Sequence, residues 1–241
     1  MQIIQSKLLK HSSGITHGFT TKENGNLAFH VGDDINNVNK NHVKLAQTVG
    51  YKKESLVHMK QIHSNIVKIV NKNNNFDNPL TCDALITDAK NTPLMVMVAD
   101  CSPILFYDKK REVIAVAHAG RAGVFHNIVH NVLRRFRDDF NSNISDIYVS
   151  VGPSIGVCCY EVGEEIYREA KELNLEYALS KRQNSYYLDI SKILRKQFLN
   201  AKIQEKNIEF SEECNCCCSK KYFSYRAEPN TGRFSGVIYL N

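Results

Sequence analysis

PLMVMVADCSPILFYDKKREVIAVAHAGRAGVFHNIVH, residues 93–130, is the stretch from which the predicted architecture is built. Its two apolar runs, 94–98 and 113–117, are too short for helices and rich in Val, Ile, Leu and Met, which is typical of buried strands. Cys101 follows the first run and His118 closes the second. The order strand, reactive residue, glycine turn indicates a functional site where these strands end.

The rest of the chain mixes predicted strands and helices. After Gly123, apolar residues recur every four positions, which predicts an amphipathic helix over 124–140. The patterns predict further helices over 36–50, over 162–173 and after Asp189, and strands over 82–87, 147–151, 208–211, 222–225 and 234–240. Several strands per helix, without strict alternation, favour an α+β fold, and we expect residues 1–241 to form a single domain.

Composition sets broad limits on function. The 241 residues are 43% hydrophobic, which is enough for a substantial core. No apolar run reaches the roughly 18 to 20 residues that span a bilayer, and the N-terminus lacks the pattern of a secretion signal. We therefore expect a cytoplasmic protein with no membrane partner. The formal net charge of +6 is spread along the chain, so nothing favours nucleic acid, and a small anionic substrate would suit it equally well.

Three residues are candidate metal ligands. A catalytic zinc site uses about three side chains from His, Cys and carboxylates and leaves one position open. His63, Cys101 and His118 meet that need, and Asp100 beside Cys101 could orient a ligand. With nine His and eight Cys in the chain, such a triple also arises by chance, so ordinary structural roles for these residues stay open.

Other reactive residues have simpler interpretations. Cys214 and Cys217 form a C-x-x-C pair, and Cys158 and Cys159 could supply a second pair. Because adjacent cysteines seldom both face one ion, we expect separate thiols that are buried or weakly oxidisable. Tyr160 and Phe223 could stack on a purine, but such aromatics more often fill the core. His126 and His130, four positions apart, could bind a metal, but no further ligands accompany them, so we expect both to be exposed to solvent.

The chain resembles a known family over nearly its full length. The matching segments are HGFTTKENGN, HVGDD, KQIHSN, CDALIT, VADCSPILFYD, AVAHAGRAG, VGPSIGVCCYEVG and FSYRAEPNTGRFSG. Together they resemble the YfiH-type polyphenol oxidase or laccase-domain proteins, now regarded as purine nucleoside phosphorylases with adenosine deaminase activity. The resemblance implies a single-domain layered αββα sandwich with mixed sheets, in which His63, Cys101 and His118 are zinc ligands.

The resemblance also implies a chemistry. Its substrates are inorganic phosphate and the purine nucleosides adenosine, inosine, guanosine and methylthioadenosine. In deamination, a zinc-bound hydroxide attacks the purine while an acid moves the proton, and Asp83 and Asp100 are the candidates for that acid. Phosphate binding falls to Arg226, Arg233 and the helix N-terminus after Gly120.

The chain departs from the family pattern beside His118. The family usually reads H-A-G-W-R-G-T, whereas this chain has Arg121 in place of the Trp and Ala122 in place of the Arg. The second Arg after the S-Y pair is likewise Ala227. If the missing Arg binds phosphate in the family, phosphorolysis here is expected either to use Arg121 or to be weak.

Three alternatives to the phosphorylase remain at the sequence level. One is an amide hydrolase with Cys101 as nucleophile and His118 as base, for which cell-wall precursors are a candidate substrate class. Another is a copper oxidase, although copper is expected to be adventitious because the chain offers no His-rich ligand set. The third is a nucleoside-binding module without catalysis, and a monomer or small homo-oligomer suits every alternative.

Overall fold

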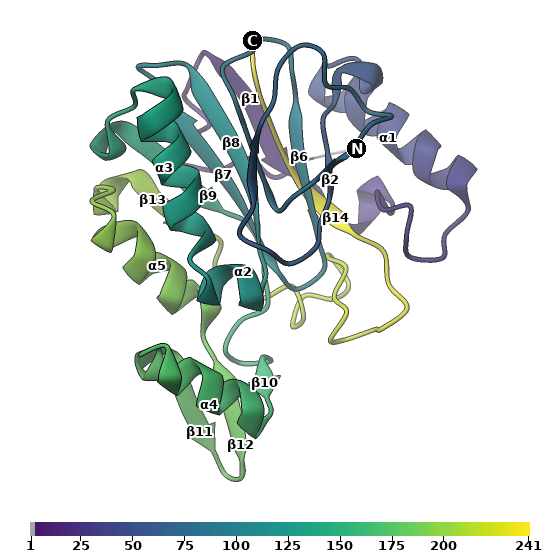
Figure 1. Cartoon of the computed structure of the whole chain (residues 1–241). Helices are drawn as coiled ribbons and strands as arrows, with labels where there is room; N and C mark the ends of the chain where they lie inside the picture. Colours follow the sequence, from purple (N-terminus) through teal and green to yellow (C-terminus); the bar gives the residue numbers. More distant parts are fainter. Residues whose placement is uncertain (1–2) are drawn as a thin grey trace.

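The computed structural model describes residues 3–241, and its elements run in the order shown in Figure 1. The helices are α1 (Ile35–Val49), α2 (Arg121–Phe125), α3 (Ile128–Phe140), α4 (Glu164–Glu172) and α5 (Ile190–Asn200). The strands are β1 (Ile15–Phe19), β2 (Met59–Lys60), β3 (Val67–Ile69), β4 (Leu80–Thr81), β5 (Ala84–Thr87), β6 (Leu94–Val98), β7 (Ser102–Asp108), β8 (Val113–Ala119), β9 (Ile147–Val151), β10 (Glu161–Val162), β11 (Leu179–Arg182), β12 (Ser185–Leu188), β13 (Ile208–Phe210) and β14 (Phe234–Leu240). Among these residues, no helix is both long and apolar enough to cross a membrane.

Two sheets lie face to face between helices. The larger has the order β13-β9-β7-β8-β5-β3 and the smaller the order β1-β14-β6. Helices α3 and α5 cover the outer face of the larger sheet, and α1 packs outside the smaller one (Figure 1). The larger sheet is mixed, because β13–β9 and β3–β5 pair in parallel and its other pairs are antiparallel. This arrangement confirms the predicted α+β layered αββα sandwich.

The central strands are buried along their whole length. Every residue of β6, β7, β8 and β14 is buried, because each of the two sheets is covered on both faces. Strands β6 and β8 match the predicted runs 94–98 and 113–117, but β7 between them was not predicted. Pro103, which has no N–H to donate, obscured it in the sequence. Pro103 is the second residue of β7, close to the strand's start, where proline is tolerated.

Local capping fixes where the helices begin and end. The Asp34 side chain accepts the N–H groups of Asn36 and Asn37 at the start of α1, and Gly50 ends that helix with a left-handed φ of 91°. The predicted continuous helix over 124–140 is wrong. Asn127 takes a left-handed φ of 55° and caps α3, so a separate five-residue helix, α2, precedes it.

Two parts of the chain between α3 and the last strand differ from the prediction. A small sheet, β10-β12-β11, carries α4 and projects from the sandwich (Figure 1). The predicted strand over 222–225 is wrong, since these residues form no ladder. Tyr222 is fully buried against Phe234 instead, so its apolar character reflects side-chain packing alone.

Candidate metal centre

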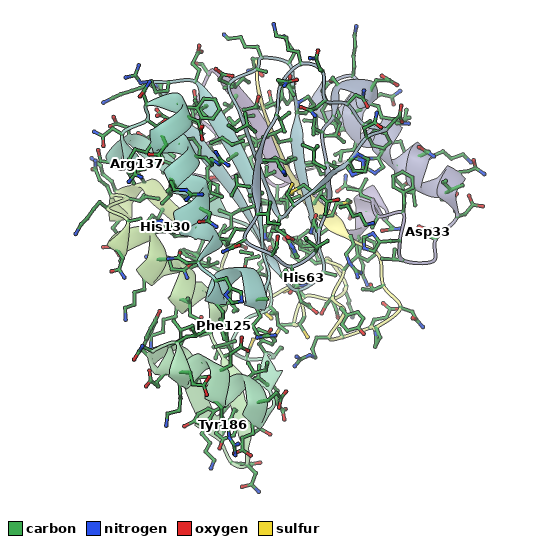
Figure 2. The ribbon with its side chains drawn as sticks, viewed as in Figure 1. Asp33, His63, Phe125, His130, Arg137 and Tyr186 are labelled. Carbon is green, nitrogen blue, oxygen red and sulfur yellow. The ribbon has the colours of Figure 1, made fainter. Side chains whose placement is uncertain are left out.

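Three side chains from separate segments converge where the strands of the two sheets end. His63 lies between β2 and β3, Cys101 between β6 and β7, and His118 in β8. One ligand atom from each lies within 4.8 Å of the other two. We call this set the pocket cluster, and Figure 2 shows His63 in place near α2.

Gly120 makes this convergence possible. A Cβ atom at Gly120 would lie 2.9 Å from His63 Cδ2 and 3.1 Å from Cys101 Sγ, closer than packed side chains allow. Because Gly120 has no Cβ atom, His63 Nε2 lies 4.0 Å from Cys101 Sγ, and the His63 and His118 rings pack edge to face with their centroids 4.7 Å apart. His63 itself has a left-handed φ of 59°, an uncommon backbone conformation that often marks a functional site.

Asp83 orients two members of the pocket cluster through hydrogen bonds. Its carboxylate is fully buried and accepts the Nδ1–H of His118 at 2.8 Å. It also accepts the backbone N–H groups of Ile62, His63 and Ser64, at 2.6 to 3.3 Å. One carboxylate thus orients two candidate ligands and directs the free Nε2 of His118 toward Cys101, as second-layer groups do at metal sites.

Charge favours a thiolate in the pocket cluster. Burial alone would raise the pKa of Cys101, but the His118 and His63 rings lower it to about 6. Burial alone would lower the pKa of His118, but Cys101 and Asp83 raise it to about 9. Burial raises the pKa of Asp83, yet its bonds from His118 and Ser64 lower it to about 2. At neutral pH the cluster therefore holds a Cys101 thiolate and the Asp83 carboxylate on either side of a protonated His118, and a metal ion would bind in place of the proton on His118 Nε2.

A cavity of about 680 Å³ opens onto the pocket cluster. All three cluster side chains line it, as do Tyr160 and Tyr225. Burial raises the pKa of Tyr160 to about 12, so this phenol stays protonated and can donate a hydrogen bond. The volume lies within the usual range for a small-molecule site.

The three predicted anion-binding arginines, Arg121, Arg226 and Arg233, also line the cavity. Arg121 forms an ion pair with Glu169 of α4. Nη1 of Arg226 donates to the carbonyls of Cys159 and Glu161, at 3.1 and 3.0 Å.

These contacts fix two of the guanidinium groups and leave other N–H groups of each for a ligand. The predicted helix N-terminus after Gly120 is different, because α2 has five residues and is too short to carry a macrodipole.

The two candidate acids have different surroundings. Asp83 is absent from the residues that line the cavity, whereas Asp100 is among them. The Asp100 carboxylate accepts hydrogen bonds from Ser224 Oγ at 2.6 Å, Arg226 N at 2.7 Å and Asn215 Nδ2 at 2.9 Å. Asp100 therefore connects the tail of the chain to the cavity wall.

Sequence reasoning missed part of the cavity wall. Tyr160, interpreted as a core residue, lines the cavity, and so does Tyr225, which is 56% exposed. No local pattern separates such tyrosines from core aromatics, because loops bring them to the cavity. The predicted exposure of His126 and His130 is correct, and Figure 2 shows His130 on α3, away from His63.

Comparison with known proteins connects this geometry to a family. The family model described as "Multi-copper polyphenol oxidoreductase laccase" matches residues 9–241. The chain belongs to this family. A purine nucleoside phosphorylase of Clostridium acetobutylicum is 36% identical over 91% of this chain and 90% of its own. Another, from Corynebacterium glutamicum, is 33% identical over 92% and 93%.

Solved structures of family members have the same fold. The hypothetical protein YfiH of Bacillus licheniformis matches with a TM-score of 0.89 at 29% identity, covering 94% of this chain and 93% of that one. YlmD from Geobacillus stearothermophilus matches with a TM-score of 0.88 at 28% identity, covering 98% and 94%. The fold and the family thus agree with the resemblance found in the motifs.

Proposed function

We propose that this chain is a zinc-dependent purine nucleoside phosphorylase that also deaminates adenosine. The observation that carries the proposal is the convergence of His63, Cys101 and His118 within 4.8 Å on the wall of a nucleoside-sized cavity. The names of the two relatives support the phosphorylase. Since the cavity draws residues from His30 to Arg233, we also propose that residues 1–241 act as a single domain.

The donor set fits zinc. Two imidazoles and one thiolate are common zinc ligands, and three protein ligands leave one position for water or substrate. When bound there, zinc supplies a Lewis acid and a nucleophilic water at neutral pH. Copper binds similar donors, but one cluster of three ligands does not provide the several copper sites of a laccase, so oxidation of phenols stays adventitious in this proposal.

The protein groups supply orientation, proton transfer and anion binding. Asp83 fixes His118 and the His63 loop as a positioning residue. Asp100 is the proposed proton carrier because, of the two candidate acids, it is the one that lines the cavity. Tyr160 and Tyr225 are suited to contact the purine ring.

Phosphate requires a cationic wall. Arg121, Arg226 and Arg233 supply it, and guanidinium groups can bind phosphate oxygens in pairs. The ion pair with Glu169 holds Arg121 at the cavity, which supports the expectation that Arg121 replaces the displaced family Arg. Purine nucleosides and inorganic phosphate are accordingly the proposed substrates.

One experiment tests both activities. Purified protein is incubated with adenosine, with and without phosphate, and adenine, inosine and hypoxanthine are separated. We expect adenine only with phosphate, and inosine in both reactions. Adenine formed equally without phosphate would contradict phosphorolysis, and the absence of inosine would contradict deamination.

A second candidate rests on the Cys101, His118 and Asp83 contacts. A thiol with a lowered pKa beside an imidazole that a buried carboxylate orients is also the arrangement of a cysteine amide hydrolase. Metal analysis separates the two candidates. Protein without zinc, whose Cys101 is alkylated rapidly, would favour the hydrolase, whereas zinc that is lost in Cys101→Ala favours the phosphorylase.

A further inference from the structure

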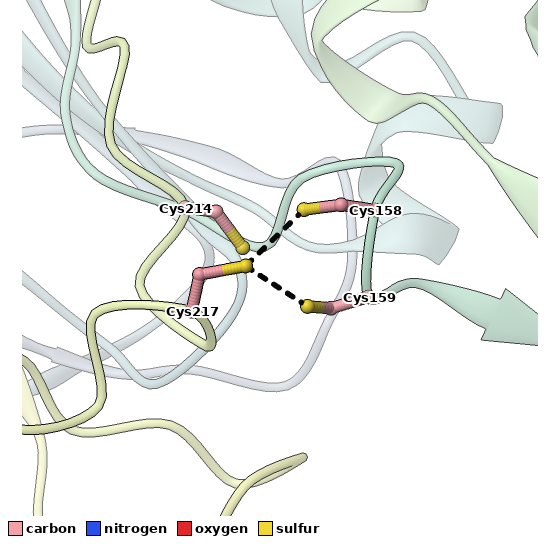
Figure 3. Close-up of side chains that lie close together, drawn as sticks. All are labelled: Cys158, Cys159, Cys214 and Cys217. Carbon is pink, nitrogen blue, oxygen red and sulfur yellow. Dashed lines mark hydrogen bonds between the residues drawn. The ribbon is translucent and has the colours of Figure 1, made fainter.

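Four cysteines that do not line the cavity form a second cluster (Figure 3). Cys158 and Cys159 lie between β9 and β10, and Cys214 and Cys217 lie between β13 and β14. Their sulfur atoms all lie within 4.8 Å of one another. We call this set the cysteine cluster. The sequence predicted separate thiols, whereas the structure brings these four together, with Cys158 and Cys217 exposed rather than buried.

The sulfur separations match those around a single ion. Cys217 Sγ lies 3.5 Å from Cys158 Sγ and 3.3 Å from Cys159 Sγ. Around a tetrahedral zinc ion, with Zn–S distances of about 2.3 Å, neighbouring sulfurs are about 3.8 Å apart. A disulfide would hold two sulfurs about 2.05 Å apart, whereas all four of these cysteines are free. Four sulfurs that all lie within 4.8 Å of one another, two pairs of them at 3.3 and 3.5 Å, are close enough to share one ion.

Two turns bring the sulfurs together. The Gly156 carbonyl accepts the N–H groups of Cys159 and Tyr160, both at 3.0 Å, so a tight turn places both adjacent cysteines beside the second segment. Figure 3 shows both sulfurs directed toward Cys217. On the second segment, the Cys214 carbonyl accepts the N–H of Cys218 at 2.9 Å and closes the turn of the C-x-x-C pair.

Gly156 permits the close approach of these turns. A Cβ atom there would lie 3.1 Å from Cys158 Sγ and 3.3 Å from Cys214 Cβ, so a larger residue would push the segments apart. The Gly156 N–H also donates to Cys214 Sγ at 3.2 Å, an interaction that stabilises a metal-bound thiolate. The N–H of Asn215 donates to the carbonyl of Ser154 at 3.1 Å and fixes the register of the segments.

We propose that Cys158, Cys159, Cys214 and Cys217 bind one zinc ion as a structural site. Four protein ligands complete a tetrahedron and leave no position for substrate, which distinguishes this site from the pocket cluster. Two ligands come from each of two segments that are far apart in sequence, so the ion would join them. Both segments continue into the cavity wall, the first at Tyr160 and the second at Arg226.

Zinc content of matched variants tests the proposal. Protein from zinc-supplemented medium, purified without chelators, is analysed as wild type and as Cys217→Ser, Cys216→Ser and Cys101→Ala. Cys216→Ser is the control, because Cys216 is an adjacent cysteine outside the cluster. We expect Cys217→Ser to carry one zinc equivalent fewer than Cys216→Ser, whatever the pocket cluster binds. Equal zinc in these two variants would overturn the proposal.

A second measurement covers the case in which Cys217→Ser does not fold. Cys101→Ala leaves all four proposed ligands intact, so we expect it to keep one zinc equivalent. After exchange with cobalt(II), it should show the strong visible and thiolate charge-transfer absorption of a tetrahedral all-sulfur site. A Cys101→Ala protein with no zinc and no such spectrum, or with iron in place of zinc, would overturn the proposal. Neither measurement depends on enzyme activity.

Discussion

The pocket cluster and the cysteine cluster both gather ligand atoms within 4.8 Å, but the chain builds them differently. The pocket cluster takes single residues from three segments and depends on Asp83, which is fully buried, to orient two of them. The cysteine cluster takes pairs from two turns and has two exposed members, Cys158 and Cys217. One cluster is formed by the sandwich, whereas the other holds two loops against it.

This difference predicts two kinds of metal site. Three ligands that face a cavity leave a position for chemistry, and four sulfurs that face one another leave none. Loss of the pocket cluster should therefore abolish turnover with a modest effect on folding. Loss of the cysteine cluster should destabilise the fold and affect turnover only through the cavity wall.

The largest expected effect is that of Cys101→Ala on turnover. Removal of one of three ligands should reduce kcat/KM for adenosine by more than about 100-fold, since even loss of an outer-layer partner costs about 10- to 100-fold. Steady-state kinetics with separated products measures this effect. Cys216→Ser, which changes a cysteine outside both clusters, should keep wild-type kinetics. Activity of Cys101→Ala near the wild-type level would remove the pocket cluster from the mechanism.

Asp83→Asn should have the next largest effect. The amide cannot accept all the N–H groups that now converge on the carboxylate, so His118 and His63 lose their orientation. We expect zinc affinity and kcat/KM to fall by about 10- to 100-fold, measured by chelator competition and by kinetics.

Asp108→Asn provides a matched control for Asp83→Asn. Asp108 is also fully buried and accepts the backbone N–H groups of Lys110 and Arg111, at 2.9 and 3.1 Å. It is the last residue of β7, whereas the pocket cluster lies at the first residue of that strand. The Asp108→Asn substitution should lower the free energy of unfolding without changing the affinity for zinc. Equal zinc affinities in the two Asn variants would show that Asp83 does not act through the ligands.

The third prediction concerns stability at the cysteine cluster. A zinc ion present at about 100 times its Kd stabilises the fold by about 2.7 kcal/mol. For a chain of this size, that corresponds to a fall in Tm of roughly 5 to 10 °C in Cys217→Ser. Differential scanning calorimetry measures the shift, with Cys216→Ser as control. A chelator should lower the Tm of the control by more than that of Cys217→Ser, because the variant has only the pocket cluster from which zinc can be removed.

How much of each cluster could be predicted depends on what holds it together. Strands β6 and β8 follow from unbroken apolar runs, and the motifs around His63, Cys101 and His118 carried the family resemblance. The convergence of these three residues depends on sheet pairing and on the space left at Gly120, so spacing alone could not establish it.

The cysteine cluster was harder to predict, because its partners lie 59 positions apart at Cys158 and Cys217. The C-x-x-C pair was visible, but only the turn at Gly156 directs both adjacent cysteines to one point. The break at Asn127 was missed for a related reason. Its left-handed φ of 55° interrupts a pattern that is fully helical in its apolar spacing.

The smallest expected effect is on stability at acid pH and concerns His42, which belongs to neither cluster. Because it does not depend on a bound metal, it can be measured on metal-free protein. His42 is fully buried, donates its Nε2–H to the Leu27 carbonyl at 2.8 Å and stacks on Phe29. Burial, together with nearby His58 and Lys53, lowers the pKa of His42 to about 4, against the bond to the Leu27 carbonyl, which raises it. Since the unfolded chain takes up this proton near pH 6.5, the stability due to neutral His42 is complete above that pH and declines as the pH falls toward 4.

Urea unfolding of metal-free protein at pH 7.5 and pH 5 measures this contribution. We expect the free energy of unfolding to fall by about 2 kcal/mol between these pH values through His42 alone. His42→Gln should lose that part of the fall, whereas His130→Gln, at an exposed position, should behave as wild type. Equal falls in wild type and His42→Gln would contradict this role of His42 and would point to other buried histidines, such as His17 and His58, whose pKa values burial also lowers.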